Sequence, residues 1–437
     1  MASSTRRGDE HGESMRHGSP LRMGSRICLP RIDVRLIGMP SAPGEYMRTL
    51  VFEPDASGHR LHFAGLVAEA LLDLGHDVLF VTSRRAPATE SWHEFVAPIA
   101  SSVSVTTADV PDHLASARLA VARSRWLAAS LRRHGPDHVY IPNGDGLSQI
   151  AAAIPSVRLS LRRAHASSEA LILRPRFAYP ADGIVGHAKR AASAYGIRHH
   201  PWTLVHHLDP LAIESTPWLD PETRAHSLMP EPVEQLAPVE REVARAALGL
   251  NAGDRYVVLP GVIDERKGAH LLLRAFAEAS LPRGTRLLLA GTVPERVRLT
   301  IKSDYPALLA DGSLAILDRF LSSEEFWLAF CAADLIAAPY PDHIGSSGVI
   351  ARAAYLGRPV ISSGFGWVGE ATRRYRLGTA VNVRDPRAFA DSLESALEAA
   401  FPFVPDPASR DYVRFNTPSN FRSRWTRGIR GEGLEGA

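Results

Sequence analysis

The sequence predicts an α/β protein with two doubly wound parallel sheets that face each other across a cleft. Short apolar runs alternate along the chain with stretches of helical spacing, as in consecutive β-α-β units. The apolar runs are continuous, which is typical of parallel strands buried on both faces. A proline-rich connection, Met229-Pro-Glu-Pro-Val233, divides the alternation into two sets of similar size.

The first set predicts a domain at residues 47–230. Gly75-His76 and Gly135-Pro136 end its two predicted helices, because glycine and proline interrupt helical structure. In chain order we expect a strand at 48–53, a helix at 59–74, a strand at 77–82, a helix at 112–133, and strands at 138–141 and 202–206.

The second set predicts a domain at residues 231–408. We expect strands at 255–260, 285–290, 313–317, 334–338 and 358–362, with helices at 237–249, 268–280, 322–332 and 347–356. Ligands bind outside the carboxyl ends of the strands in such sheets, so both domains should aim their loops into the cleft.

Composition limits the class of protein. The chain is 45% apolar and 22% charged, as in an ordinary globular protein, and its net charge of +3 does not indicate a nucleic-acid partner. Two cysteines, Cys28 and Cys331, imply no disulfide framework. No apolar run could cross a membrane, so we expect a cytoplasmic protein. Peripheral membrane contact stays open, although the first domain shows no amphipathic basic helix.

Residues 1–46 differ from the rest of the chain. Arg, Gly, Ser, Glu and His are frequent there, and neither apolar periodicity nor the apolar core of a signal peptide is present. This composition predicts a disordered extension. The protein itself could start at Met39 or Met47.

Two polar groups follow strands of the first domain. In Ser57-Gly58-His59, Gly58 permits close approach to a ligand, and His59 could act as a base or bond a hydroxyl. The alternative is a helix-capping turn. In Val205-His206-His207-Leu208-Asp209, one histidine could bond a ligand while the aspartate fixes its tautomer. The alternative is a buried histidine bonded to backbone; the spacing matches no usual metal site.

Two further groups follow strands of the second domain. Arg266-Lys267-Gly268 comes after its first strand, in a chain with only three lysines among 50 basic residues. Residues 343–350, His-Ile-Gly-Ser-Ser-Gly-Val-Ile, open a helix whose free N–H groups suit a phosphate. A diphosphate between the two groups would meet two cations and a helix dipole. The alternatives are a solvated turn and serines that only cap a helix.

Residues 235–400 resemble the donor domain of family 4 glycosyltransferases, which have the GT-B fold of two Rossmann-like domains. The matching segments are Gly261 through Lys267-Gly268, Leu287 to Gly291, Cys331 to Pro339, Gly345 to Gly348, Ala353 to Ile361 and Gly366 to Glu370. Residues 47–230 resemble the acceptor domain more loosely. Residues 409–437 resemble the C-terminal helix that crosses back to the first domain, here predicted at 411–427, followed by a tail.

The resemblance implies a hexosyltransferase of carbohydrate biosynthesis that uses a UDP- or GDP-type nucleotide sugar. It implies retention of anomeric configuration, no metal or other cofactor, and a carbohydrate, lipid or small-molecule acceptor. Arg266, Lys267, Ser346, Ser347 and Gly348 would bind the donor diphosphate. The candidate catalytic histidines are His59, His206 and His207, and the donor sugar or nucleotide would lie near Gly58, Arg352 and Glu370.

The sequence departs from the family pattern at three positions. Two glutamates eight residues apart are replaced by Ile344 and Arg352, and a family arginine is replaced by Val262. Arg352 could meet a phosphate or an acidic sugar, or lie at the surface. Besides an active enzyme of a divergent subgroup, a catalytically degenerate GT-B subunit stays open. An epimerase fits less well, because the carboxylates that it would place around the sugar are not seen after the phosphate-binding loops. A phosphorylase fits less well, because it would require a much longer chain.

Overall fold

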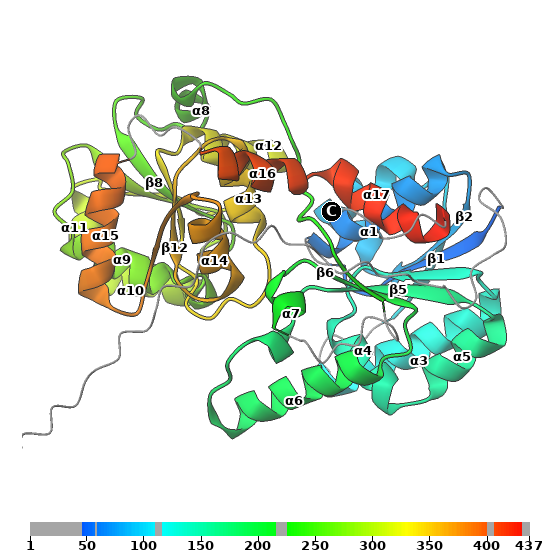
Figure 1. The fold of residues 1–437 in the computed structure, drawn as a ribbon. Helices are drawn as coiled ribbons and strands as arrows, with labels where there is room; N and C mark the ends of the chain where they lie inside the picture. Colours follow the sequence, from blue (N-terminus) through cyan, green and yellow to red (C-terminus); the bar gives the residue numbers. More distant parts are fainter. Residues whose placement is uncertain (1–45, 57–58, 110–115, 216–224, 400–405, 431–437) are drawn as a thin grey trace, which may run out of the picture.

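The computed structural model describes residues 46–56, 59–109, 116–215, 225–399 and 406–430. Two parallel sheets, each covered by helices on both faces, dominate the molecule (Figure 1). The predicted α/β class with two doubly wound sheets is therefore confirmed. Ser57, Gly58 and the predicted extension up to residue 45 lie outside the described residues.

The first sheet has the order β3-β2-β1-β4-β5-β6-β7, and every neighbouring pair is parallel. Its strands are β1 (Arg48–Glu53), β2 (Asp77–Ser83), β3 (Ser104–Ala108), β4 (His138–Ile141), β5 (Ser167–Ile172), β6 (Leu204–His207) and β7 (Ala225–Leu228). The strand order reverses between β1 and β4, and this is the switch point at which doubly wound sheets bind ligands.

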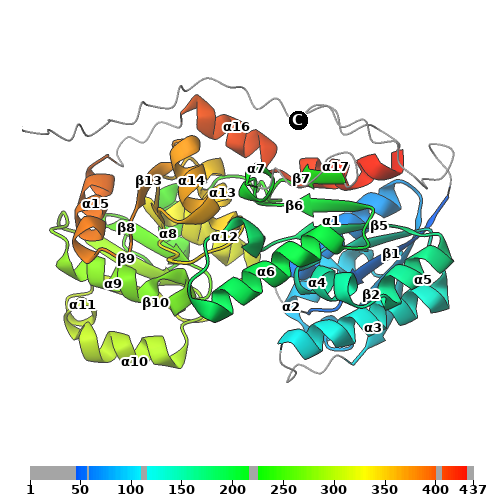
Figure 2. The same cartoon turned by 60° about the horizontal axis from the view of Figure 1, so that its bottom comes forward.

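Helices cover the first sheet in two layers (Figure 2). One layer contains α1 (His59–Asp73) and α2 (Glu90–Phe95). The other contains α3 (Ser116–His134), α4 (Asp145–Ala153), α5 (Ser156–Ala164) and α6 (Gly183–His199). Short elements complete the domain: α7 (Leu211–Glu214) and the 3₁₀ turns η1 (Ala86–Ala88), η2 (Ala97–Ile99) and η3 (Arg176–Ala178). Alternate residues of β1 point into the two layers, so Val51 and Phe52 lie in different cores.

The second sheet has the order β10-β9-β8-β11-β12-β13, also parallel, with its switch point between β8 and β11. Its strands are β8 (Arg255–Pro260), β9 (Thr285–Ala290), β10 (Leu314–Leu317), β11 (Leu335–Ala338), β12 (Val360–Ser363) and β13 (Gly378–Val381). Its helices are α8 (Arg241–Ala247), η4 (Glu265–Lys267), α9 (Ala269–Glu278), α10 (Glu295–Asp304), α11 (Pro306–Ala310), α12 (Ser323–Ala332), α13 (Gly348–Tyr355), α14 (Gly366–Arg374) and α15 (Pro386–Ala399).

Some strands escaped prediction because their sequences are polar. β5 begins with Ser-Ser-Glu, yet all of its residues are buried, and β3 is a polar edge strand. A search for continuous apolar runs does not detect such strands. The strands at 255–260 and 285–290 were predicted to the residue, since they are apolar and end at glycines.

The C-terminal segment forms two helices where one was predicted. They are α16 (Pro407–Phe415) and α17 (Pro418–Arg430), and the residue before Pro418 is biased away from helical conformation. α16 packs on α13 of the second domain, and α17 packs on α1 of the first (Figure 1). Phe421 and Trp425 of α17 are fully buried, so this segment joins the cores of both domains. None of the described helices is both long and apolar enough to cross a membrane.

Candidate functional site

The loops after β8 and β11 meet at the switch point of the second sheet. Gly261 follows β8 with a φ of 96°, and a Cβ at this position would lie 2.5 Å from Lys267 Nζ. The ammonium of Lys267 folds back over the strand end and donates to the Pro260 carbonyl at 2.8 Å. Glycine at position 261 therefore makes room for the cation at the carboxyl end of the sheet.

The turn η4 holds Lys267 in place. Asp264 caps this turn, and its Oδ1 accepts from Lys267 N at 3.0 Å. Burial, with the charges of Arg266 and Arg352, lowers the pKa of Lys267 to about 8, against the opposing charge of Asp264. The exposed Arg266 pairs with Asp264 at 3.3 Å. Positive charge is therefore crowded here, and a bound anion would relieve the repulsion.

The start of α13 lies beside this lysine. His343 Nε2 donates to the Ser346 carbonyl at 2.8 Å, and the Tyr340 ring contacts both His343 and Lys267. Burial lowers the pKa of His343 to about 4, and the charges of Arg174, Arg266 and Lys267 act in the same direction. Ser347 occupies the N-cap position without a side-chain capping bond. The first N–H groups of a helix have no partner within the helix, so they can bind an anion.

Arg352, one helical turn into α13, is surrounded by carboxylates. Its guanidinium lies over the Phe326 ring at 5.6 Å from the ring centre. Burial lowers its pKa, while Glu234, Glu231 and Glu94 raise it by their charges. Burial raises the pKa of Glu231, whereas a hydrogen bond from Ser346 and the charge of Arg352 lower it. The alternative that Arg352 is a solvent-facing surface residue is therefore wrong.

Glu370 takes part in a contact between the domains. It pairs with Arg374 at 3.2 Å, and Arg374 also pairs with Glu214 of α7 at 2.8 Å. The carboxylate of Glu370 is only half-buried, so it is accessible at the same edge of the sheet.

Tyr179 joins the carboxyl edges of the two sheets. Its hydroxyl donates to Asp209 and accepts from Trp367 N at 3.1 Å and from Gly345 N at 3.4 Å. Trp367 lies in the first turn of α14, which follows β12, and Gly345 lies in the loop after β11. A Cβ at Gly345, which has a φ of 107°, would clash with the Leu173 carbonyl of the first domain. The loops of both sheets therefore face and touch each other.

At the switch point of the first sheet, the basic side chains already have a carboxylate partner within the protein. Glu53 ends β1, is fully buried, and accepts from Asp55 N at 3.0 Å. Burial raises the pKa of Glu53 to about 8, against the charges of Arg60 and Arg123. Asp55 pairs with both of these arginines. This edge thus presents paired charges, unlike the crowded cations of the second sheet.

Part of the second domain is similar to a known family. Residues 254–399 match the family model described as glycosyl transferases group 1. These residues make up most of the second domain, which is called the group 1 domain below. A D-inositol 3-phosphate glycosyltransferase of Mycobacterium tuberculosis (strain ATCC 25618 / H37Rv) is 33% identical over 164 residues, which are 37% of this chain and 33% of that protein. The same similarity holds for the protein of that name from Mycobacterium bovis (strain BCG / Pasteur 1173P2). The chain thus matches about one third of the length of these relatives.

Solved structures extend the comparison to both domains. Sucrose-phosphate synthase from Thermosynechococcus elongatus has a TM-score of 0.68 at 16% identity, over 88% of this chain and 98% of that one. Anabaena Alr3699/HepE in complex with UDP has a TM-score of 0.64 at 13% identity, over 89% of this chain and 100% of that one. At these identities the likeness shows the fold, which is GT-B as the resemblance implied.

Outside the group 1 domain, the two candidate histidines of β6 do not reach a ligand position. His206 is 0% exposed; its Nε2 lies 2.8 Å from Glu169 Oε2 and its Nδ1 lies 2.6 Å from Ser227 Oγ. The Trp425 ring of α17 covers it. The prediction that His206 is a catalytic histidine that bonds a ligand is therefore wrong for this structure, because side chains of the core satisfy the imidazole.

His207 is equally buried. Its Nε2 lies 3.0 Å from His226 Nδ1, and burial, followed by the charges of three neighbouring histidines, lowers its pKa well below the ordinary value. Asp209 does not fix either histidine, since it bonds Tyr179 instead. His59 begins α1, but its side chain lies outside the described residues, as does Gly58.

The structure brings together Arg266, Lys267, Arg352 and the backbone of 346–348, all from the group 1 domain. Residues of this region that sequence reasoning missed are Arg174, Tyr179, Glu231, Glu234 and His343. Two of them lie in segments that the sequence had singled out: His343 in residues 343–350, and Glu231 in the proline-rich connection. Within the described residues, no group of three His, Cys, Asp or Glu side chains is placed to hold a metal ion.

Proposed function

We propose that the protein is a glycosyltransferase that moves a hexosyl unit from a UDP- or GDP-type nucleotide sugar to an acceptor. The observation that carries this proposal is the convergence of Lys267, Arg266 and the start of α13 at the switch point between β8 and β11. The group 1 domain supports the reaction class. Structural neighbours that hold UDP and UDP-glucose support a nucleotide-sugar donor.

The chemistry follows from the leaving group. When the bond between the sugar and the diphosphate breaks, negative charge grows on the diphosphate. The ammonium of Lys267 and the N–H groups at Ser346 to Gly348 are fixed beforehand where that charge develops, so they stabilise the transition state more than the bound donor. Because these groups supply the positive charge, we propose transfer without a metal, and we propose retention from the resemblance to family 4.

Arg352 and its neighbours suggest how the nucleotide is held despite the missing glutamates. Glu231 and Glu234 flank Arg352, so carboxylates still lie beside α13 although the helix itself carries none there. We propose that the carboxylate of Glu231 accepts hydrogen bonds from the ribose hydroxyls, with Arg352 balancing its charge. Glu370 is the candidate for contact with the donor sugar.

The acceptor would approach from the first sheet, whose loops face this site through Tyr179 and Leu173. It is a carbohydrate, lipid or small molecule in this proposal, and the reaction takes place in the cytoplasm.

Calorimetric titration with UDP, GDP and ADP tests the donor site. We expect one nucleotide to bind at micromolar concentration, and Lys267→Ala to weaken it by about tenfold to a hundredfold, the value of a charge-assisted hydrogen bond. Lys302→Ala is the matched control, since Lys302 is an exposed lysine of α10 in the same domain. Equal binding by wild type and Lys267→Ala would rule out the diphosphate assignment.

A catalytically degenerate partner subunit is the second candidate, favoured by Ile344 and Arg352 at the positions of the family glutamates. The two candidates differ in turnover. Release of free nucleotide diphosphate from its sugar conjugate, lost in Lys267→Ala, supports the enzyme. Nucleotide binding without any release over a panel of acceptors supports the subunit.

A further inference from the structure

The outer helices α3, α5 and α6 of the first domain carry charge of one sign. They contain 11 Lys and Arg residues and no Asp or Glu, although the whole chain has 50 basic and 47 acidic residues. Together with α4 they form one layer, in which α5 packs on α3, α3 on α4 and α4 on α6. Figure 1 shows this layer below the first sheet, on the side opposite to α1 and α17.

Most of this charge points to solvent. Arg123 is turned inward to Asp55, and Arg158 donates to the His199 carbonyl at 2.6 Å, which ties α5 to α6. The other nine basic side chains are exposed: Arg118, Arg125, Arg132, Arg133, Arg162, Arg163, Lys189, Arg190 and Arg198. We call these nine residues the basic layer.

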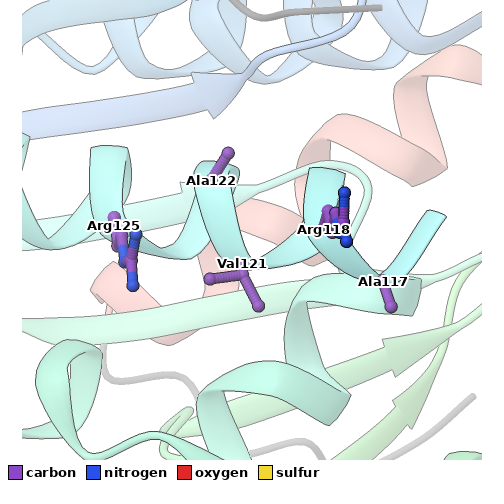
Figure 3. Close-up of a pocket in the computed structure, with 5 residues that line it drawn as sticks. All are labelled: Ala117, Arg118, Val121, Ala122 and Arg125. Carbon is purple, nitrogen blue, oxygen red and sulfur yellow. The ribbon is translucent and has the colours of Figure 1, made fainter. Parts of the chain in front are cut away.

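Apolar side chains are exposed among these charges. Ile184 and Val185, in the first turn of α6, are 89% and 65% exposed, and Leu159 and Tyr195 also face solvent. On α3 a shallow groove is lined by Ala117, Val121 and Ala122 between two arginines, Arg118 and Arg125 (Figure 3). Exposed arginine together with exposed aliphatic side chains is typical of helices that lie in the interface of a membrane.

We propose that the basic layer docks this protein on an anionic phospholipid surface. Arginines near such a surface each contribute attraction to the lipid head groups, and Ile184 and Val185 enter the boundary of the acyl chains. Residues 1–45 contain seven arginines and five acidic residues, so their charge does not suit them as the occupant of a basic face. A nucleic acid would account for the arginines but not for the exposed aliphatic residues.

The basic layer cannot be recognised from the sequence of any one of its helices. α5 has three arginines and α6 has three basic residues, and each is unremarkable by itself. A search for one basic amphipathic helix therefore does not find this surface, because it is assembled from segments up to 80 residues apart by the packing of α5 between α3 and the end of α6.

The full-length protein can be tested by co-sedimentation with vesicles. We expect binding to vesicles of equal parts phosphatidylcholine and phosphatidylglycerol, no binding to phosphatidylcholine alone, and loss of binding in high salt. The triple variant Arg125→Glu, Arg162→Glu and Arg163→Glu should bind roughly a hundredfold more weakly, at about fivefold for each arginine. The matched control, Arg283→Glu, Arg387→Glu and Arg410→Glu, makes the same charge change at exposed arginines outside the layer.

Ile184→Ser separates a lipid surface from other polyanions. It should weaken vesicle binding by about tenfold, because the isoleucine no longer enters apolar surroundings. Equal losses in the control triple variant would mean that net charge alone acts, and would overturn the proposal. Absence of binding to the anionic vesicles would also overturn it. So would binding to duplex DNA that the triple variant loses, if the protein does not bind the vesicles.

Discussion

The two switch points of this molecule are built alike and are charged differently. In the first sheet, the buried Glu53 keeps its proton below about pH 8, and Asp55 pairs with both Arg60 and Arg123, so the arginines of this edge already have a carboxylate partner. In the second sheet, Lys267 and Arg266 after β8 face the start of α13 with Asp264 as their nearby carboxylate. The difference indicates that the fold supplies the position of a site, while the balance of charge decides whether an anion is needed there.

The same contrast separates two kinds of basic residue at strand ends. Lys267 follows β8 and His206 lies near the end of β6, yet His206 is enclosed by Glu169, Ser227 and Trp425. Lys267 has only a backbone carbonyl as hydrogen-bond acceptor for its ammonium among the described contacts. A basic side chain that is bonded to other side chains, as His206 is, thus has a structural role, whereas one that bonds only a backbone carbonyl, as Lys267 does, is available to a ligand.

Removal of Glu169 should give the largest effect on stability. Burial acts to raise the pKa of Glu169, but the imidazoles of His138 and His206 together hold it below the ordinary value. We expect Glu169→Ala to lower the free energy of unfolding by about 3–5 kcal/mol, because it removes the buried carboxylate that bonds the imidazoles of His138 and His206. Urea unfolding measures this, with the half-exposed Glu370→Ala as a control expected to lose less than about 1 kcal/mol. A fully stable Glu169→Ala protein that has lost turnover would instead place this network in the active site.

Glu53→Gln should remove a dependence of stability on pH. With a pKa of about 8 in the folded protein and an ordinary value of 4.5, Glu53 keeps a proton that the unfolded chain releases between these values. Stability should therefore fall as the pH rises from 4.5 to 8, by at most about 1.4 kcal/mol per pH unit. Urea unfolding of wild type and variant near both ends of this range checks it. Parallel losses in the two proteins would show that another group titrates.

The second switch point should show a pH dependence in ligand binding, and at a higher pH than the change in stability at the first. Lys267 must be protonated to attract a diphosphate, and its pKa in the free protein is about 8. The affinity for the nucleotide should therefore fall above this pH by up to about tenfold per pH unit. Titrations on both sides of pH 8 measure the slope. Lys267→Arg is the control, because its guanidinium stays protonated and should flatten the curve; an unchanged slope would point to a different cation.

How much of the fold and of the site could be predicted from the sequence depends on whether the buried segments are apolar. β8 and β9 are apolar and were predicted with their bounds, and the cations after β8 followed from the topology of the sheet. β5 was missed because Ser167, Ser168 and Glu169 look like a loop, although they form the buried polar network beneath β6. That network is also why His206 was misplaced. A histidine and its partner 37 residues away cannot be paired without the strand order.

Tyr179→Phe should give the smallest effect, and it tests the contact that joins the two switch points. The phenol accepts from Trp367 N and Gly345 N and donates to Asp209, whose pKa is raised to about 6 by burial, against that hydrogen bond. Loss of the hydroxyl should cost about 1 kcal/mol of unfolding free energy in a urea titration. Tyr195→Phe, an exposed tyrosine of α6, should cost nothing measurable. If Tyr179→Phe keeps full stability but weakens nucleotide binding, the tyrosine positions the loops after β11 and β12 for the donor. If it changes neither, the two domains hold together through Arg374 and α17, and the switch point of the first sheet does not influence that of the second through Tyr179.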